Sequence, residues 1–211
     1  MYDARYRTWP PRELMVSLQP TSLRMSEDQF LAWARTQEGR YELLAGKVRR
    51  LAGATRAHER VAKRIFMVLY AQVDERTFDL NKGGFGVQAP SASGSGTVLY
   101  PDIVIDPQSG AGGERSTCQP VVIIEVVSSR ADCEPHIQKL DRYKAWDTLR
   151  HLAVFDHEEP RACVWTKTGD GWPARPVRIE GAGGIVNLPA IGAAITLDEI
   201  YRSHTYRTFA R

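Results

Sequence analysis

The longest continuous apolar run in this chain covers residues 120–127 and contains a single charged residue, Glu125. β-Branched residues dominate the run, which is typical of a central strand buried on both faces. An ionised carboxylate buried in such a strand costs on the order of several kcal/mol unless a cation pairs with it. We therefore expect Glu125 to lie at the end of the strand, beside a cation.

A second apolar run covers residues 99–106 and also carries an acid, Asp102. Together the two runs predict neighbouring strands that each contribute a carboxylate. Hard divalent cations prefer oxygen ligands, so two carboxylates placed in this way suggest a metal site.

The clearest helical period runs from Arg56 to Val73, where apolar side chains recur on one face. Those apolar positions are Val61, Ala62, Ile65, Val68 and Leu69. His58 shares the same face, so we expect it to point inward. It is either a core or capping histidine with one satisfied nitrogen, or a functional group.

Two further segments have helical patterns. Ser26 and Gln29 have the spacing of a capping box, at the start of a short helix that ends by Gly39. The other helix covers residues 132–147, and Lys139 falls within its apolar face. A lysine in such a position commonly covers apolar surface with its stem, and Lys139 could also pair with Glu125 in a plain salt bridge, so a structural role stays open beside a functional one.

Shorter apolar runs predict the remaining strands. Residues 41–48 favour a hairpin that turns at Ala45 and Gly46. Residues 78–88 suggest one irregular strand, and residues 91–96 a turn that closes a hairpin into the Asp102 strand. We also expect strands at residues 151–156 and 162–166, and a strand that runs into a short helical turn at residues 195–200.

Length and composition indicate a single globular domain. The chain has 211 residues, of which 43% are hydrophobic and 25% charged, as is ordinary for a folded protein of one domain. Residues 1–24 show no clear period and are expected to form an extended arm, so that the domain covers residues 25–211. The net charge of +3 is too small to indicate nucleic acid binding by itself, and it does not oppose such binding.

No apolar run approaches the length of a membrane span, and the N-terminus lacks the apolar core of a signal peptide. The three cysteines, Cys118, Cys133 and Cys163, are odd in number and widely spaced. This pattern favours reduced thiols over disulfides or a zinc site. We therefore expect a cytoplasmic protein that does not engage a membrane.

The order of these features resembles the PD-(D/E)xK nuclease superfamily and, more closely, the Uma-type family of restriction-endonuclease-like proteins. The resemblance spans residues 26–201, and its specificity comes from the order and spacing of the motifs, since each motif alone is common. The matching stretches are Gly39–Leu44 with Gly46, His58 at the start of a helix, Pro101-Asp102, Glu125-Val126 with Ser128, Lys139 and Tyr143 in the next helix, and Leu188-Pro189 to Ile200.

The resemblance implies a fold of the α/β (α+β) class. Its core would be restriction-endonuclease-like, with a mixed β-sheet flanked by helices and with an N-terminal helix and β-hairpin. It also implies a Mg²⁺ (or Mn²⁺) site held by Asp102, Glu125 and the carbonyl of Val126. A hard cation of this kind lowers the pKa of bound water and neutralises a phosphate.

The remaining site residues also follow from the resemblance. Lys139 would orient or deprotonate the attacking water, or stabilise the pentavalent phosphate. Glu42 would add a ligand or a water contact, and His58 would touch the scissile phosphate or orient Glu42. Tyr143 and Ser128 would support the site.

The chain departs from the family pattern at several positions. The usual lysine two residues after the glutamate is Val127, and Lys139 on the following helix stands at the distance expected for its replacement. Pro135 replaces an aspartate, Ala45 replaces a favourable turn residue, and Leu152-Ala153 replaces an aromatic pair. None of these changes removes an expected metal ligand.

The sequence therefore predicts a Mg²⁺-dependent endonuclease that hydrolyses phosphodiester bonds of DNA. One alternative is a catalytically silent member of the same fold that binds nucleic acid or protein. A weaker alternative is a hydrolase of another phosphoester. Dimerisation is implied by the resemblance, because cutting two strands favours two sites.

Overall fold

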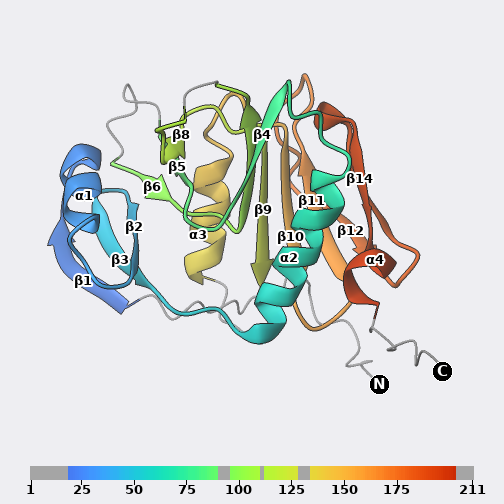
Figure 1. Ribbon diagram of the computed structural model, residues 1–211, viewed down its shortest axis with the longest axis horizontal. Helices are drawn as coiled ribbons and strands as arrows, with labels where there is room; N and C mark the ends of the chain where they lie inside the picture. The colour runs from blue at the N-terminus through green and yellow to red at the C-terminus, as the bar shows by residue number, and fades with distance from the viewer. Residues whose placement is uncertain (1–18, 90–95, 110–111, 128–133, 203–211) are drawn as a thin grey trace, which may run out of the picture.

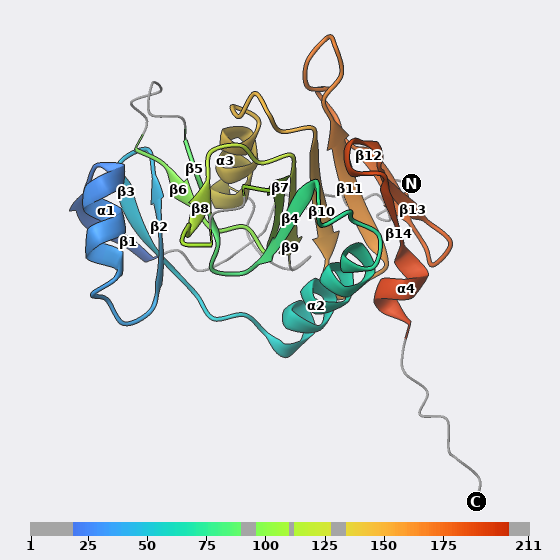
Figure 2. The ribbon, with the colours of Figure 1, turned by 45° about the horizontal axis from the view of Figure 1, so that its top comes forward.

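The computed structural model describes residues 19–89, 96–109, 112–127 and 134–202, which form two six-stranded sheets with helices packed on them (Figures 1 and 2). Of the predicted arm, residues 1–18 lie outside the described residues, and the last six residues form the strand β1 (Gln19–Arg24).

None of the helices in the described part of the chain has the length and apolarity needed to cross a membrane. Cys118 is exposed and Cys163 is buried, and both are free thiols.

The first sheet has the strand order β1-β3-β2-β6-β5-β8. Its other strands are β2 (Arg40–Leu44), β3 (Lys47–Leu51), β5 (Gly86–Gln88), β6 (Val98–Leu99) and β8 (Ser116–Thr117). Helix α1 (Glu27–Ala34) covers one face of this sheet, where Phe30 packs on Leu43 and Val48. The capping box of Ser26 and Gln29 at its start is confirmed.

The predicted hairpin is also confirmed, because β2 and β3 pair antiparallel with Leu44 opposite Lys47. The two turn residues, Ala45 and Gly46, have φ angles of 50° and 75°. Positive φ at both central positions is the geometry that matches the right-handed twist of a two-residue hairpin. Glycine adopts it freely, whereas Ala45 does so against the preference of an L-residue.

The second sheet has the order β12-β11-β10-β9-β7-β4 and carries the predicted central strand. Its strands are β4 (Phe78–Lys82), β7 (Ile103–Pro107), β9 (Val122–Val127), β10 (His151–Asp156), β11 (Arg161–Thr166) and β12 (Val177–Glu180). All six residues of β9 are buried. Strand β9 pairs parallel with β10 and antiparallel with β7, so the sheet is mixed.

Helices cover the second sheet on its two faces. Helix α2 (Arg56–Tyr70) packs its apolar stripe on one face, against side chains that include Ile124. Helix α3 (Glu134–Tyr143) packs on the other face, where its apolar residues contact a cluster that includes Ile123. That cluster also contains Leu44 of the first sheet, so α3 lies between the two sheets (Figure 2). The expected mixed sheet flanked by helices is therefore confirmed.

The end of the described chain forms β13 (Ile185–Leu188), the 3-10 helix η2 (Pro189–Ile191), β14 (Ala193–Thr196) and α4 (Leu197–Tyr201). The predicted strand that runs into a short helical turn is confirmed as β14 and α4. Helix α4 lies against α2, where Arg64 Nη1 donates to the Ile200 carbonyl at 2.6 Å.

Three predicted features need correction. Residues 78–88 are not one strand, because Gly83 and Gly84, both at positive φ, separate β4 of the second sheet from β5 of the first. The expected hairpin is present, because β5 pairs antiparallel with β6, but residues 99–106 are not one strand: Leu99 ends β6 of the first sheet and Ile103 begins β7 of the second. Glu125 does not end its strand: it is the fourth residue of β9.

Candidate active site

Three charged side chains from three elements meet between the sheets. Lys139 of α3 places Nζ 2.7 Å from Glu42 Oε1 of β2 and 2.9 Å from Glu125 Oε1 of β9. All three residues are buried, with 8%, 2% and 4% of their surface exposed. Side chains alternate along β9, so Glu125 faces α3 together with Ile123 and Val127. The cation expected beside Glu125 is therefore Lys139, which comes from the helix and not from the strand end.

Two tyrosines complete the hydrogen bonds of this cluster. The Tyr143 hydroxyl, fully buried one helical turn after Lys139, donates to Glu125 Oε1 at 2.7 Å. Tyr100 contributes its backbone N–H and its backbone carbonyl to the network. Its N–H donates to Glu42 Oε1 at 2.9 Å, and its carbonyl accepts from Lys139 Nζ at 3.4 Å. Residue patterns carry no signal for such backbone contacts, and the sequence did not predict a role for Tyr100.

The cluster contains two buried carboxylates and one ammonium. Burial raises the pKa of Glu125 to about 7, against the opposing charge of Lys139. Burial also works to lower the pKa of Lys139, but the charges of Glu125 and Glu42 outweigh it and the pKa is raised. Lys139 therefore stays protonated and pairs with both carboxylates.

Asp102 lies beside this cluster, immediately before β7. Ile103 pairs with Ile124 in the ladder, which puts Asp102 one step further along, opposite Glu125. Asp102 Oδ2 accepts from the Val126 N–H at 2.8 Å and lies 3.0 Å from His58 Nε2. Burial would raise the pKa of Asp102, but the hydrogen bond and charge of His58 lower it.

His58 lies in the first turn of α2, and its main-chain N–H donates to the Thr55 side chain that caps the helix. Burial works to lower its pKa, but the hydrogen bond and charge of Asp102 outweigh this effect and raise it. Its Nδ1 is buried and has no hydrogen-bond partner among the described residues. The expectation that His58 orients Glu42 is therefore wrong, since its partner is Asp102.

The structure thus places Glu42, Asp102, Glu125, Lys139 and Tyr143 around one position, with His58 and the Val126 backbone attached through Asp102. Ser128, expected to support the site, lies outside the described residues.

The donor set fits a hard divalent cation. Asp102 Oδ1 and Glu125 Oε2 take no hydrogen bond or ion pair from the described residues, because the partners above all use the other oxygen. Two carboxylates and a carbonyl are ligands that suit Mg²⁺. Within the described residues, no group of three or more His, Cys, Asp or Glu side chains is arranged to hold a metal ion, and the expected set needs only two such side chains.

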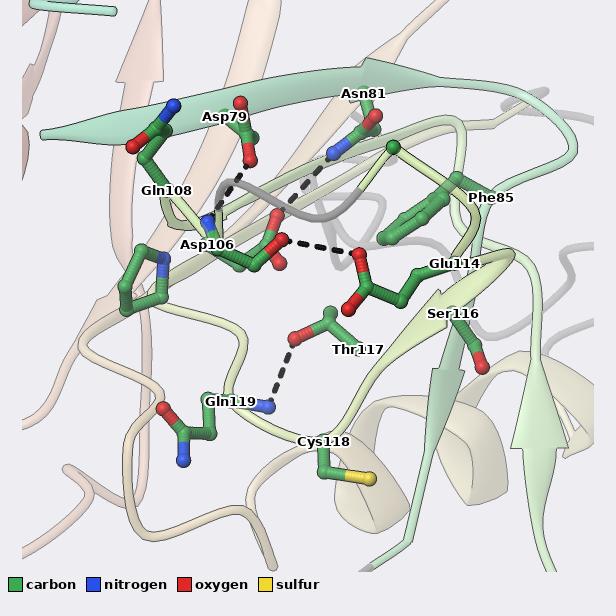
Figure 3. Close-up of a pocket in the computed structure, with 13 residues that line it drawn as sticks. Asp79, Asn81, Phe85, Asp106, Gln108, Glu114, Ser116, Thr117, Cys118 and Gln119 are labelled. Carbon is green, nitrogen blue, oxygen red and sulfur yellow. Dashed lines mark hydrogen bonds between the residues drawn. The ribbon is translucent and has the colours of Figure 1, made fainter. Parts of the chain in front are cut away.

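A separate cavity of about 650 Å³ lies at the opposite end of β7 (Figure 3). Its walls carry Asp79, Asp106 and Glu114, and none of the candidate site residues lines it. Burial raises the pKa of Asp106 to about 6. The described residues that line the cavity include no lysine or arginine to offset its carboxylates, unlike the candidate site with Lys139, so the cavity would repel a nucleic acid backbone.

Comparison with known proteins supports the fold and identifies the family. No curated protein matches the chain. A crystal structure from Anabaena variabilis, described as that of a putative nuclease belonging to DUF820, superposes with a TM-score of 0.66. It is 13% identical, and the match covers 84% of this chain and 97% of that one, which shows a shared fold. The family model Uma2, described as "Putative restriction endonuclease", matches residues 27–198. Because this match spans most of the sequence, the chain belongs to the Uma2 family.

Proposed function

We propose that this protein is a metal-dependent endonuclease that hydrolyses phosphodiester bonds of DNA. The observation that carries the proposal is the Lys139 ammonium, which bridges Glu42 and Glu125 beside Asp102. These groups come from four separate segments and include two carboxylates, each with one oxygen that has no partner among the described residues. The nuclease-like family and fold support the same reading.

Asp102, Glu125 and the Val126 carbonyl would hold Mg²⁺ or Mn²⁺. When bound, the ion would supply Lewis acidity, which lowers the pKa of water and neutralises phosphate charge. Lys139 has a raised pKa, so it acts as a cation that orients the attacking water or stabilises the phosphate. Glu42 holds Lys139 in place and offers Oε2 to a water molecule.

His58 would act through Asp102. Its Nε2 faces Asp102 Oδ2, and its Nδ1 is buried, so neither nitrogen is available to touch the scissile phosphate. A histidine that donates to a metal-binding carboxylate fixes the orientation of that carboxylate. His58 is therefore a positioning residue in this proposal.

One observation favours a second candidate function, binding without cleavage. The Lys139 ammonium has three donors, and Glu42, Glu125 and the Tyr100 carbonyl account for all of them. A lysine engaged in this way serves catalysis only if it exchanges one partner for the substrate or its water. The leading proposal also includes a homodimer, since cutting both strands of a duplex favours two sites. It places the protein in the cytoplasm.

The test is cleavage of supercoiled plasmid and linear duplex DNA by the purified protein, with Mg²⁺, with Mn²⁺ or with a chelator. The proposal requires metal-dependent cutting that is lost in Asp102→Ala and in Glu125→Ala. Cutting that survives both substitutions contradicts it. Salt-dependent DNA binding without any cutting supports the second candidate.

A further inference from the structure

The β2–β3 hairpin presents two arginines on the same face as Glu42. Arg49 is the cross-strand partner of Glu42, and Arg40 precedes Glu42 by two residues on the same strand. Side chains alternate between the faces of a sheet, and directly paired residues share a face. The same face carries Leu44, which packs in the cluster with Leu140 and Tyr143 of α3. Arg40 and Arg49 therefore lie on the side of the hairpin that faces α3 and the candidate site.

Arg40 lies at the end of the hairpin away from its turn, and Arg49 lies level with Glu42 in the middle of the ladder. The turn at Ala45 and Gly46 forms the other end of the hairpin. From the Arg40 end, the chain leaves β3 and runs directly to the start of α2, which carries His58 (Figure 1). Arg40 is exposed and Arg49 is half-buried, whereas Glu42, directly opposite Arg49, is buried.

The negative charge of the site explains why a substrate phosphate would need cationic side chains such as these arginines. Glu42, Asp102 and Glu125 together would repel a phosphate, and the Lys139 ammonium is engaged by two of them. A polyanionic substrate therefore needs cations at the margin of the site as well as a metal within it. Arginine suits this task, because its planar guanidinium binds phosphate oxygens through two parallel hydrogen bonds.

We propose that Arg40 and Arg49 bind the sugar–phosphate backbone of duplex DNA where it enters the site, so that the β2–β3 hairpin is the docking surface for the substrate. This inference rests on the proposed nuclease function and adds the direction of approach: the duplex crosses the Arg40 end of the hairpin towards α2. The contacts are to phosphates of the backbone and do not depend on base sequence.

The experiment measures binding apart from cleavage. A fluorescein-labelled DNA duplex is titrated with the full chain in a chelator, and fluorescence anisotropy gives the binding constant over a series of salt concentrations. Each phosphate contact contributes about 0.9 to the slope of log K against log salt. We expect Arg40→Gln with Arg49→Gln to make the slope shallower by about 2, and Arg40→Gln alone by about 1.

Arg178→Gln is the matched control, because Arg178 is an exposed arginine on β12, the edge strand of the second sheet. It should leave the slope unchanged, and thermal unfolding checks that each variant is folded. A wild-type slope retained in the folded Arg40→Gln variant overturns the proposal, and so does a wild type that does not bind duplex DNA. Loss of slope in a protein that never cuts DNA would support the docking surface and contradict the nuclease.

Discussion

Lys139 and Glu125 form a buried ion pair, with Nζ 2.9 Å from Oε1, between a helix and the middle of a fully buried strand. This pair explains how β9 tolerates a carboxylate among aliphatic residues. A second carboxylate, Glu42, shares the ammonium, so the pair is the centre of a network and not an isolated salt bridge. Several measurable consequences depend on it.

Replacement of Lys139 by methionine should destabilise the protein strongly. The change leaves Glu42 and Glu125 buried without their cation, and breaking a buried pair in this way costs about 3–5 kcal/mol. Urea unfolding near neutral pH measures the loss. Lys167→Met is the control, since the Lys167 ammonium lies 3.7 Å from the fully exposed Asp147 carboxylate and should contribute less than about 1 kcal/mol. Equal losses in the two variants would show that the network does not hold the sheets together.

Tyr143→Phe removes one hydroxyl and keeps the ring that packs beside Trp146. Glu125 Oε1 would lose a 2.7 Å hydrogen bond in a fully buried position. We expect a loss of about 1–3 kcal/mol in the free energy of unfolding, because a hydrogen bond to a buried acidic group is not replaced by water. Differential scanning calorimetry measures it. An unchanged melting temperature would mean that Tyr143 fills space and does not hold Glu125.

The turn of the β2–β3 hairpin offers a stabilising change. Ala45 has φ of 50°, a conformation that asparagine adopts more readily than alanine. Ala45→Asn should therefore raise the free energy of unfolding by about 0.5–1 kcal/mol. Gly46→Ala should lower it by about 1 kcal/mol, because φ is 75° there. Chemical denaturation of both variants checks the signs, and a gain from Gly46→Ala would contradict the turn geometry.

His151 should make stability fall in mild acid. Its Nε2 accepts from the Ala190 N–H at 3.1 Å and its Nδ1 lies 3.1 Å from Thr166 Oγ1, so the neutral ring suits both partners. Burial lowers its pKa from 6.5 to about 4. Between these two pH values the unfolded chain thus binds more protons than the folded protein. The contribution of the neutral His151 ring to stability is complete above pH 6.5 and disappears as the pH falls towards 4. The change amounts to at most about 3 kcal/mol.

The comparison of wild type with His151→Gln isolates this effect from the other acidic groups. The difference in unfolding free energy between the two proteins should shrink as the pH is lowered from about 7 to about 4.5. A difference that stays constant over this range would show that His151 does not titrate with folding.

Local patterns predicted much of the fold. The capping box at Ser26, the apolar stripe of α2 and the hairpin at Ala45-Gly46 each depend on residues close in sequence. The edge strands were missed for a physical reason. Strand β12 is largely exposed and has no buried alternation, and β13 alternates over only four residues, which is too short to predict a strand.

The sequence predicted which residues form the candidate site but not most of the contacts between them. The order of Glu42, Asp102, Glu125 and Lys139 along the chain singled them out through a family resemblance, and the structure brings them together. A cation was expected beside Glu125, and it is Lys139, whereas the contacts of Glu42 and His58 could not be predicted because they depend on tertiary packing. His58 reaches Asp102 across 44 positions of sequence, and Tyr100 contributes only backbone atoms.

The most direct test compares two aspartates at opposite ends of β7. Asp102 faces the Lys139 network, whereas Asp106 lines the separate acidic cavity. The measurement is the single-turnover rate of DNA cleavage with Mg²⁺ for Asp102→Asn and Asp106→Asn. We predict a loss on the order of 10²-fold or more for Asp102→Asn and a wild-type rate within a few-fold for Asp106→Asn. A wild-type rate in Asp102→Asn, or an equal loss in both variants, would contradict the assignment of the active site.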